Sequence, residues 1–158
     1  MRWRALIDRQ VLVRVVIGML ALANLWWGVW ARFAPRHFFD VFPGFGLHWT
    51  AAYPPYNEHL VTDLGSTFLT LGFLLAVAAV LDDRRVRVVV LAGVLVFNTL
   101  HLAFHASHPG TMGGFDLGAS VTTLAAGVVA PAILLLLDRA PRQPASVTPP
   151  DTAAGEPR

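Results

Sequence analysis

The stretch LDDRRVR, residues 81–87, separates two long apolar runs and decides how the chain can fold. It is long enough for a tight turn but not for a wide crossing, so we expect the helices on either side of it to form an antiparallel hairpin. Its arginines also mark one face of a membrane if the two apolar runs cross a bilayer. Both expectations depend on how apolar the rest of the chain is.

The composition places the chain in a membrane. Of its 158 residues, 55% are hydrophobic and only 14% are charged, which is too apolar for a water-soluble domain of this length. A hydrocarbon core about 30 Å thick takes about 20 helical residues to cross. Four segments meet that requirement, at residues 11–32, 60–81, 86–106 and 116–137. The sequence therefore predicts an all-α integral membrane protein, an up-and-down four-helix bundle that occupies residues 1–138.

Arginine placement sets the predicted orientation of this bundle. All 12 basic residues are arginines, and most lie before the first span, in the 81–87 turn or after the fourth span. The loops at 33–57 and 107–115 together hold only Arg36, and Arg32 closes the first span. By the positive-inside rule, both termini and the turn are cytoplasmic. We therefore predict a multi-pass protein of the bacterial inner membrane, whose partner is the lipid bilayer and not a nucleic acid.

The two ends of the chain and its cysteine content limit the possibilities further. The sequence ALA at 21–23 resembles a signal-peptide cleavage site, but Arg14 interrupts the apolar stretch before it and apolar residues continue after it. We therefore expect the first helix to be retained. Residues 139–158 are rich in proline and small polar residues, which predicts a disordered cytoplasmic tail. The chain has no cysteine, which excludes disulfides and thiolate ligands.

The loop at 33–57 is unusually rich in aromatic residues, prolines and glycines. We expect it to lie in the membrane interface as a cap over the bundle. His37 and His48 lie in this loop and are predicted to be interfacial. We predict an outer aromatic belt that includes Trp26, Trp27, Trp30, Trp49, Tyr53 and Tyr56.

Polar residues follow helical spacing in three of the spans. The stripes are His59, Asp63, Ser66 and Thr70 in the second span, Asn98, His101 and His105 in the third, and Asp116, Ser120, Thr123 and Gly127 in the fourth. Asn24 lies at a comparable depth in the first span, and His108 follows the third. Polar side chains in a membrane usually turn toward the bundle interior. The stripes therefore predict a polar funnel that opens outward above an apolar plug.

The histidines and the aspartate of the second and third spans are candidate metal ligands. Imidazole and carboxylate without thiolate suit zinc, copper, iron or manganese. The predicted ligand set is His59, Asp63, His101 and His105, and the predicted supporting or ligand-binding residues are Asn24, Glu58, Ser66, Asn98, His108, Asp116, Ser120 and Thr123. No reaction is predicted, although a catalytic metal would activate water with Asp116 or Glu58 as general base.

Two other interpretations of the same polar residues stay open. The funnel can be a metal-free pocket for a small or lipid-like ligand. The polar residues can instead be interhelical hydrogen-bonding groups, which contribute about 0.6 to 2 kcal/mol each in membranes. In that case the protein is a structural or accessory subunit of a membrane complex, or a homo-oligomer.

A family resemblance adds to this interpretation. RVVIGMLALANLWWGVWARFAP, residues 14–35, resembles the opening helix of the DoxX-like group of small four-helix bacterial membrane proteins. The stretches YPPYNEHLVTDLG (53–65) and NTLHLAFHASHPG (98–110) are similar to uncharacterised small membrane proteins of actinobacteria. The resemblance implies an up-and-down bundle with an accessory role beside a quinone-linked or thiol-linked oxidoreductase. A thiol-active member would need the cysteine that this chain lacks.

Overall fold

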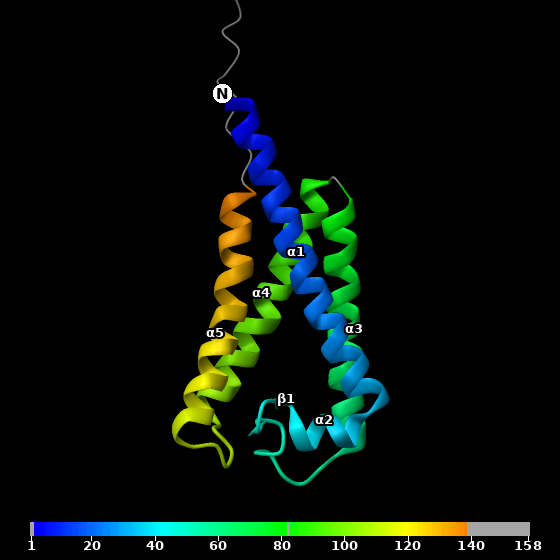
Figure 1. Cartoon of the computed structure of the whole chain (residues 1–158), viewed down its shortest axis with the longest axis vertical. Coiled ribbons are helices and arrows are strands. Elements are labelled where there is room, and N and C mark those ends of the chain that lie inside the picture. Colours follow the sequence, from blue (N-terminus) through cyan, green and yellow to red (C-terminus); the bar gives the residue numbers. More distant parts are fainter. Residues whose placement is uncertain (1, 82, 139–158) are drawn as a thin grey trace, which may run out of the picture.

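Four long helices account for most of the part of the chain that the structure describes, residues 2–81 and 83–138 (Figure 1). The structure is a computed structural model. The helices are α1 (Arg2–Phe33), α3 (Glu58–Val80), α4 (Arg84–Ser107) and α5 (Gly114–Leu137), and each is long and apolar enough to cross a membrane. The predicted all-α class with four long apolar helices is confirmed. The tail predicted at 139–158 lies outside the described residues.

The turn between α3 and α4 is fixed by two polar side chains. Asp83 caps α4, because its carboxylate accepts a hydrogen bond from the backbone N–H of Arg85 at 2.7 Å. Arg14 of α1 donates to the carbonyls of Ala79 and Val80, each at 2.9 Å, and so satisfies the last turn of α3. The stretch that separates the two apolar runs therefore forms the tight reversal that the sequence predicts.

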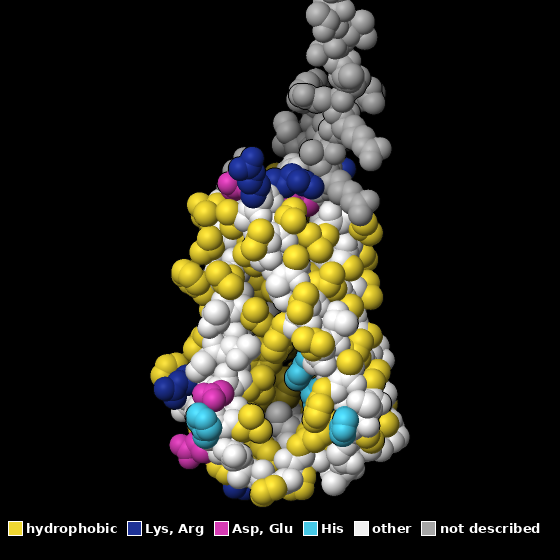
Figure 2. Space-filling view, turned by 180° about the vertical axis from the view of Figure 1, so that it is seen from behind, with side chains coloured by type: hydrophobic (Ala, Val, Ile, Leu, Met, Phe, Trp, Pro, Cys, Tyr) yellow, Lys and Arg dark blue, Asp and Glu magenta, His cyan; other side chains and the backbone are white. Residues whose placement is uncertain are grey.

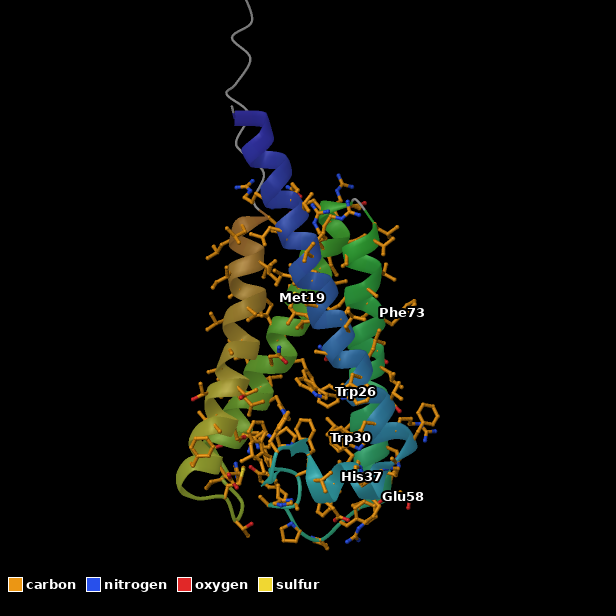
Figure 3. All side chains as sticks on the ribbon, in the orientation of Figure 1. Met19, Trp26, Trp30, His37, Glu58 and Phe73 are labelled. Atoms are coloured by element: carbon orange, nitrogen blue, oxygen red, sulfur yellow. The ribbon has the colours of Figure 1, made fainter. Side chains whose placement is uncertain are left out.

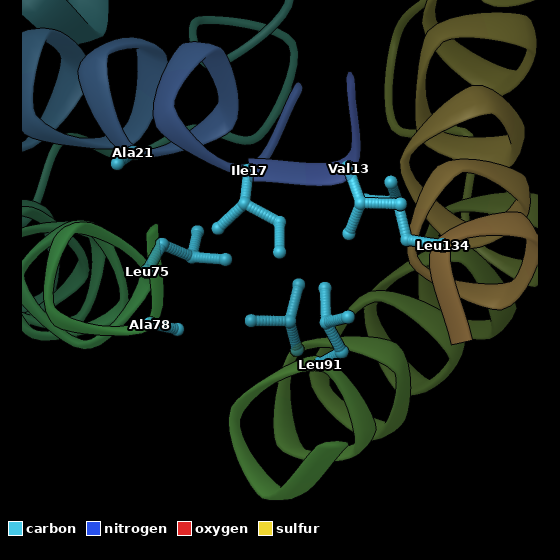
Figure 4. Close-up of a cluster of buried hydrophobic side chains, with 8 residues drawn as sticks. Val13, Ile17, Ala21, Leu75, Ala78, Leu91 and Leu134 are labelled. Atoms are coloured by element: carbon cyan, nitrogen blue, oxygen red, sulfur yellow. The ribbon is translucent and has the colours of Figure 1, made fainter. Parts of the chain in front are cut away.

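The long helices associate in two pairs, α1 with α3 and α4 with α5 (Figure 1). We call the end of the molecule that carries Arg84 and Arg85 the arginine end, and the opposite end, with the loop between α1 and α3, the loop end. The pairs meet near the arginine end and diverge toward the loop end (Figure 1). All four helices contribute to a buried apolar cluster where the pairs meet: Val13, Ile17, Ala21, Leu75, Ala78, Leu91, Val94 and Leu134 (Figure 4).

Glycines bring α1 and α3 into backbone contact. A Cβ atom added at Gly65 would lie 2.6 Å from the backbone nitrogen of Arg32, and one at Gly72 would lie 2.9 Å from that of Leu25. Only glycine fits at such distances, and small residues of this kind are typical of close helix contacts in membranes. The face of α3 that carries Gly65 and Gly72 is therefore the face that packs on α1.

A buried ion pair holds α4 against α5 at the arginine end. The Arg87 guanidinium lies 3.0 Å from the Asp138 carboxylate, and the two side chains are 3% and 0% exposed. Arg87 also donates to the side-chain oxygen of Gln10 at 3.1 Å, and Arg84 donates to the backbone carbonyl of Asp138. From the sequence these arginines are expected only to orient the chain in the membrane, whereas in the structure Arg87 is part of the buried core.

The loop between α1 and α3 has more structure than predicted. It contains the short helix α2 (Pro35–Val41) and an antiparallel pair of two-residue strands, β1 (Pro43–Gly44) and β2 (Leu47–His48). Phe38 of α2 is fully buried beneath α1 and α3.

Most of the aromatic residues predicted to form a belt pack against other aromatic rings. Trp27, Trp30 and Trp49 pack around Phe42 with ring centroids about 6 Å apart, and Tyr56 packs on Phe39. These rings pack around the buried residues Ala31, Phe38 and Val61, and edge-to-face contacts between aromatic rings are favourable. The exposed large side chains of Met19, Trp26 and Phe73 lie on the outer surface of α1 and α3 (Figure 3).

Candidate functional site

The polar stripe of α4 faces into the molecule, as predicted. We call Asn98, His101 and His105 the inner stripe. Of the six histidines, all of which the structure describes, only His101 and His105 are half-buried, and the others are exposed. The two rings meet edge to face with centroids 4.5 Å apart, and His101 stacks on Phe97. The inner stripe thus presents two adjacent imidazoles beside an aromatic ring.

A tyrosine from the loop fixes the protonation pattern of His105. The Tyr53 hydroxyl donates to the backbone carbonyl of His108 at 2.7 Å and lies 2.7 Å from Nδ1 of His105. Because its one proton goes to the carbonyl, the Tyr53 oxygen accepts a hydrogen bond from Nδ1–H of His105. In the neutral ring, Nε2 of His105 then carries a free lone pair. A phenol is protonated at neutral pH, and burial raises the pKa of Tyr53 further above its ordinary value of 10.0.

The ring nitrogens of His101 form no hydrogen bond with any residue that the structure describes. A neutral imidazole offers one donor and one acceptor. Together with Nε2 of His105, the pair therefore presents three unused hydrogen-bonding positions.

The space beside these histidines opens on the side of the molecule. Figure 2 shows a hollow between the two helix pairs, with apolar side chains on its walls and histidine side chains inside it. At the loop end, the backbone N–H of Thr111 donates to the carbonyl of Ala52 at 3.0 Å, and Tyr53 contacts His105. These contacts fasten the loop to the α4–α5 turn. The predicted funnel mouth at the outer end is thus covered by the loop, and the hollow opens sideways.

The polar stripe of α3 faces away from the hollow, which contradicts the predicted funnel. We call His59, Asp63, Ser66 and Thr70 the outer stripe, and all four are exposed. Nε2 of His59 lies 3.3 Å from the Asp63 carboxylate, and the two side chains are 86% and 63% exposed. The reason is the close contact of Gly65 and Gly72 with α1, because those glycines lie on the opposite face of the helix.

The predicted metal ligands are consequently not assembled. His59 and Asp63 form one pair on the outside of α3, and His101 and His105 form another inside. Within residues 2–81 and 83–138, no three histidine, aspartate or glutamate side chains come close enough to hold a metal ion together.

The other predicted site residues have mixed positions. Asn98 donates to the backbone carbonyl of Gly127 at 2.7 Å and so links α4 to α5. Asn24 donates within its own helix, to the carbonyl of Leu20. Among the rest, Ser120 is buried, whereas Glu58, Thr123 and His108 are exposed. Only Asn98 therefore makes the interhelical hydrogen bond expected of a structural residue.

Asp116 lines a small cavity whose lining includes neither His101 nor His105. This cavity has a volume of about 200 Å³ and lies between the loop and the start of α5. It is lined by His48, Ala51, Ala52, Thr111, Met112, Gly113 and Asp116.

Two side chains that contact the inner stripe were not predicted from the sequence. Phe97 precedes His101 by four residues, so helical spacing could have identified it. Tyr53 is 52 residues from His105, and no local pattern signals that contact.

Comparisons with models of protein families, with curated proteins and with solved structures match this chain to none of them. The resemblance to DoxX-like proteins therefore stays a prediction from the sequence.

Proposed function

We propose that this protein binds a membrane-soluble molecule in the hollow, and that His101 and His105 hold the polar head of that molecule. The observation that carries the proposal is the arrangement of His105. Tyr53 occupies its Nδ1–H, so Nε2 of this half-buried ring is left as a hydrogen-bond acceptor. Figure 2 shows histidine side chains inside a hollow with apolar walls. Small-molecule pockets typically combine mostly apolar walls with a few oriented polar groups.

The position of the hollow suits a ligand that arrives through the bilayer. Its mouth lies on the side of a bundle whose four long helices are apolar enough to span a membrane (Figure 2). The loop end is covered by contacts of Tyr53 and Thr111. An apolar molecule can therefore enter laterally without crossing water.

The histidines select the head group. Nε2 of His105 accepts a hydrogen bond, and a neutral His101 can donate one. A hydroxyl or a phenol does both, since its oxygen accepts and its hydrogen donates. A head that only accepts, such as an ester carbonyl, leaves Nε2 of His105 without a partner, and burying an unpaired polar group costs about 1–3 kcal/mol. We propose a hydroxyl-headed or phenol-headed ligand.

We also infer that the arginine end is cytoplasmic and that both termini lie on that side. Arg84 and Arg85 lie at this end, and the opposite loops are poor in arginine. Reporter fusions at Arg85 and after Arg142 should then report cytoplasmic, and a fusion at Phe45 should report external. The reverse pattern would contradict this orientation.

Mass spectrometry of organic extracts tests the ligand proposal. Wild-type protein, purified in mild detergent without a histidine tag, should carry a co-purifying hydroxyl-headed or phenol-headed molecule in near one-to-one ratio. The double substitution His101→Ala with His105→Ala should lose it, and His59→Ala on the outer stripe should keep it.

Equal retention in all three proteins would contradict the proposed site. Elemental analysis of the same samples separates the metal alternative. Near-stoichiometric zinc, copper, iron or manganese in wild type and in His59→Ala, lost only in the double variant, would replace the organic ligand with a metal. A metal lost in both variants would support the four-ligand set predicted from the sequence.

A further inference from the structure

The outer stripe of α3 is an exposed polar surface on a helix long enough to span a membrane. His59, Asp63, Ser66 and Thr70 all lie on the face opposite Gly65 and Gly72. Within the part of the chain that the structure describes, their side chains form no hydrogen bond or ion pair with another long helix. Figure 2 shows acidic and histidine side chains grouped at the edge of the molecule, outside the hollow.

The stripe extends well into the apolar part of the helix. Thr70 follows Glu58 by 12 residues, which is about 18 Å along the axis at 1.5 Å per residue. Beyond it the same face is apolar, with Phe73 and Leu74 exposed. Polar side chains within a membrane span usually face protein rather than lipid. We therefore expect another helix to cover this face.

We propose that the outer stripe is the contact between two copies of this chain. The stripe is complementary to itself, since it carries an acid and a base one helical turn apart, with Nε2 of His59 3.3 Å from the Asp63 carboxylate. At a two-fold contact between parallel helices, each Asp63 comes within reach of the His59 of the second copy. A partner of different sequence would need its own acidic and basic side chains at matching positions.

The two hydroxyl residues fit the same contact. Ser66 and Thr70 donate to backbone carbonyls of their own helix, each at 2.9 Å, so their hydrogens are already used. Their small side chains are four residues apart, which is the spacing that lets two membrane helices approach closely. The contact is independent of the ligand proposed for the hollow, because the hollow lies on the other side of α3.

Disulfide cross-linking tests this proposal cleanly because the chain has no cysteine. Ser66→Cys and Thr70→Cys, oxidised in native membranes, should each give a covalent dimer. Leu100→Cys is the matched control, since Leu100 is an exposed residue at a similar distance from the loop end on α4. It should stay monomeric. Two positions are used so that the test survives if one variant does not fold.

Three results would overturn the proposal. These are equal cross-linking at all three positions, no covalent dimer from a folded variant, and a cross-link only to a protein of different mass. Förster transfer between labelled copies in nanodiscs measures the same association without an introduced cysteine. Asp63→Asn should reduce that transfer several-fold, whereas Asp40→Asn in the loop should leave it unchanged. An unchanged transfer for Asp63→Asn would remove the ionic part of the contact and with it the argument for a second copy.

Discussion

α3 and α4 carry similar polar stripes, yet the stripe of α4 faces the hollow and the stripe of α3 faces outward. In α4 the inner stripe continues the buried row of Arg87, Leu91 and Val94 at spacings of four and three residues. In α3 there are two such rows, and the row that packs inward is the one with Gly65 and Gly72. The comparison shows that in α3 the face that allows close backbone contact turns inward, even though the opposite face carries the polar side chains.

The largest expected effect comes from releasing α4 from α5. Asp138→Ala removes the Asp138 carboxylate from its buried pair with Arg87, and breaking a buried pair this way costs about 3–5 kcal/mol. Asp40→Ala is the control, because its pair with Arg36 is exposed and contributes only about 0–1 kcal/mol. Thermal unfolding in detergent, followed by tryptophan fluorescence, should show a large loss only for Asp138→Ala. Equal losses would mean that the ion pair does not fix the orientation of α4.

A smaller effect is expected from the glycine contact that orients α3. Gly65→Ala places a Cβ 2.6 Å from the backbone of Arg32, and overpacking of this kind costs about 1–3 kcal/mol. Gly93→Ala on α4 meets no atom within 4 Å and should stabilise its helix by up to about 1 kcal/mol. The same unfolding measurement should thus give opposite signs. A neutral Gly65→Ala would show that close approach does not decide the inward face of α3.

The smallest effect separates the two stripes themselves. Asn98→Ala removes the hydrogen bond to Gly127 of α5 and should cost about 0.6–2 kcal/mol. Ser66→Ala removes only a bond within its own helix, so the stability of the single chain should change by less than about 0.5 kcal/mol. Unfolding of monomeric protein at high detergent concentration is the relevant measurement. A larger cost for Ser66→Ala than for Asn98→Ala would contradict the assignment of the inner and outer faces.

Comparison of the structure with the sequence predictions shows which parts of the fold could be predicted. Apolar length and the 81–87 turn predicted the four long helices, because crossing a bilayer requires long runs that a single sequence shows directly. The inward face of α4 was also predictable, since its polar and apolar rows coincide. The outward face of α3 was not predictable. Helical spacing shows that α3 has a polar row and a glycine row, but it does not show which of them packs inward.

The candidate site was predictable in part for a related reason. His101 and His105 lie one turn apart on a single helix, so periodicity identified them together. Tyr53 reaches them from a loop, and only the folded chain brings it there. The four-residue metal set combined two helices on the assumption that both polar faces point inward, and that assumption holds for α4 alone.

The most direct test of the account is the protonation pattern of the histidine rings, measured by nitrogen-15 solid-state NMR on histidine-labelled protein in lipid bilayers. At pH 8, above the ordinary histidine pKa of about 6.5, His105 should carry its proton on Nδ1 and leave Nε2 bare. Tyr53→Phe should weaken that preference. Removal of the co-purifying molecule should shift the signals of His101 and His105 and leave His59 unchanged. A proton on Nε2 of His105, or a response at His59 in place of the inner pair, would contradict the account.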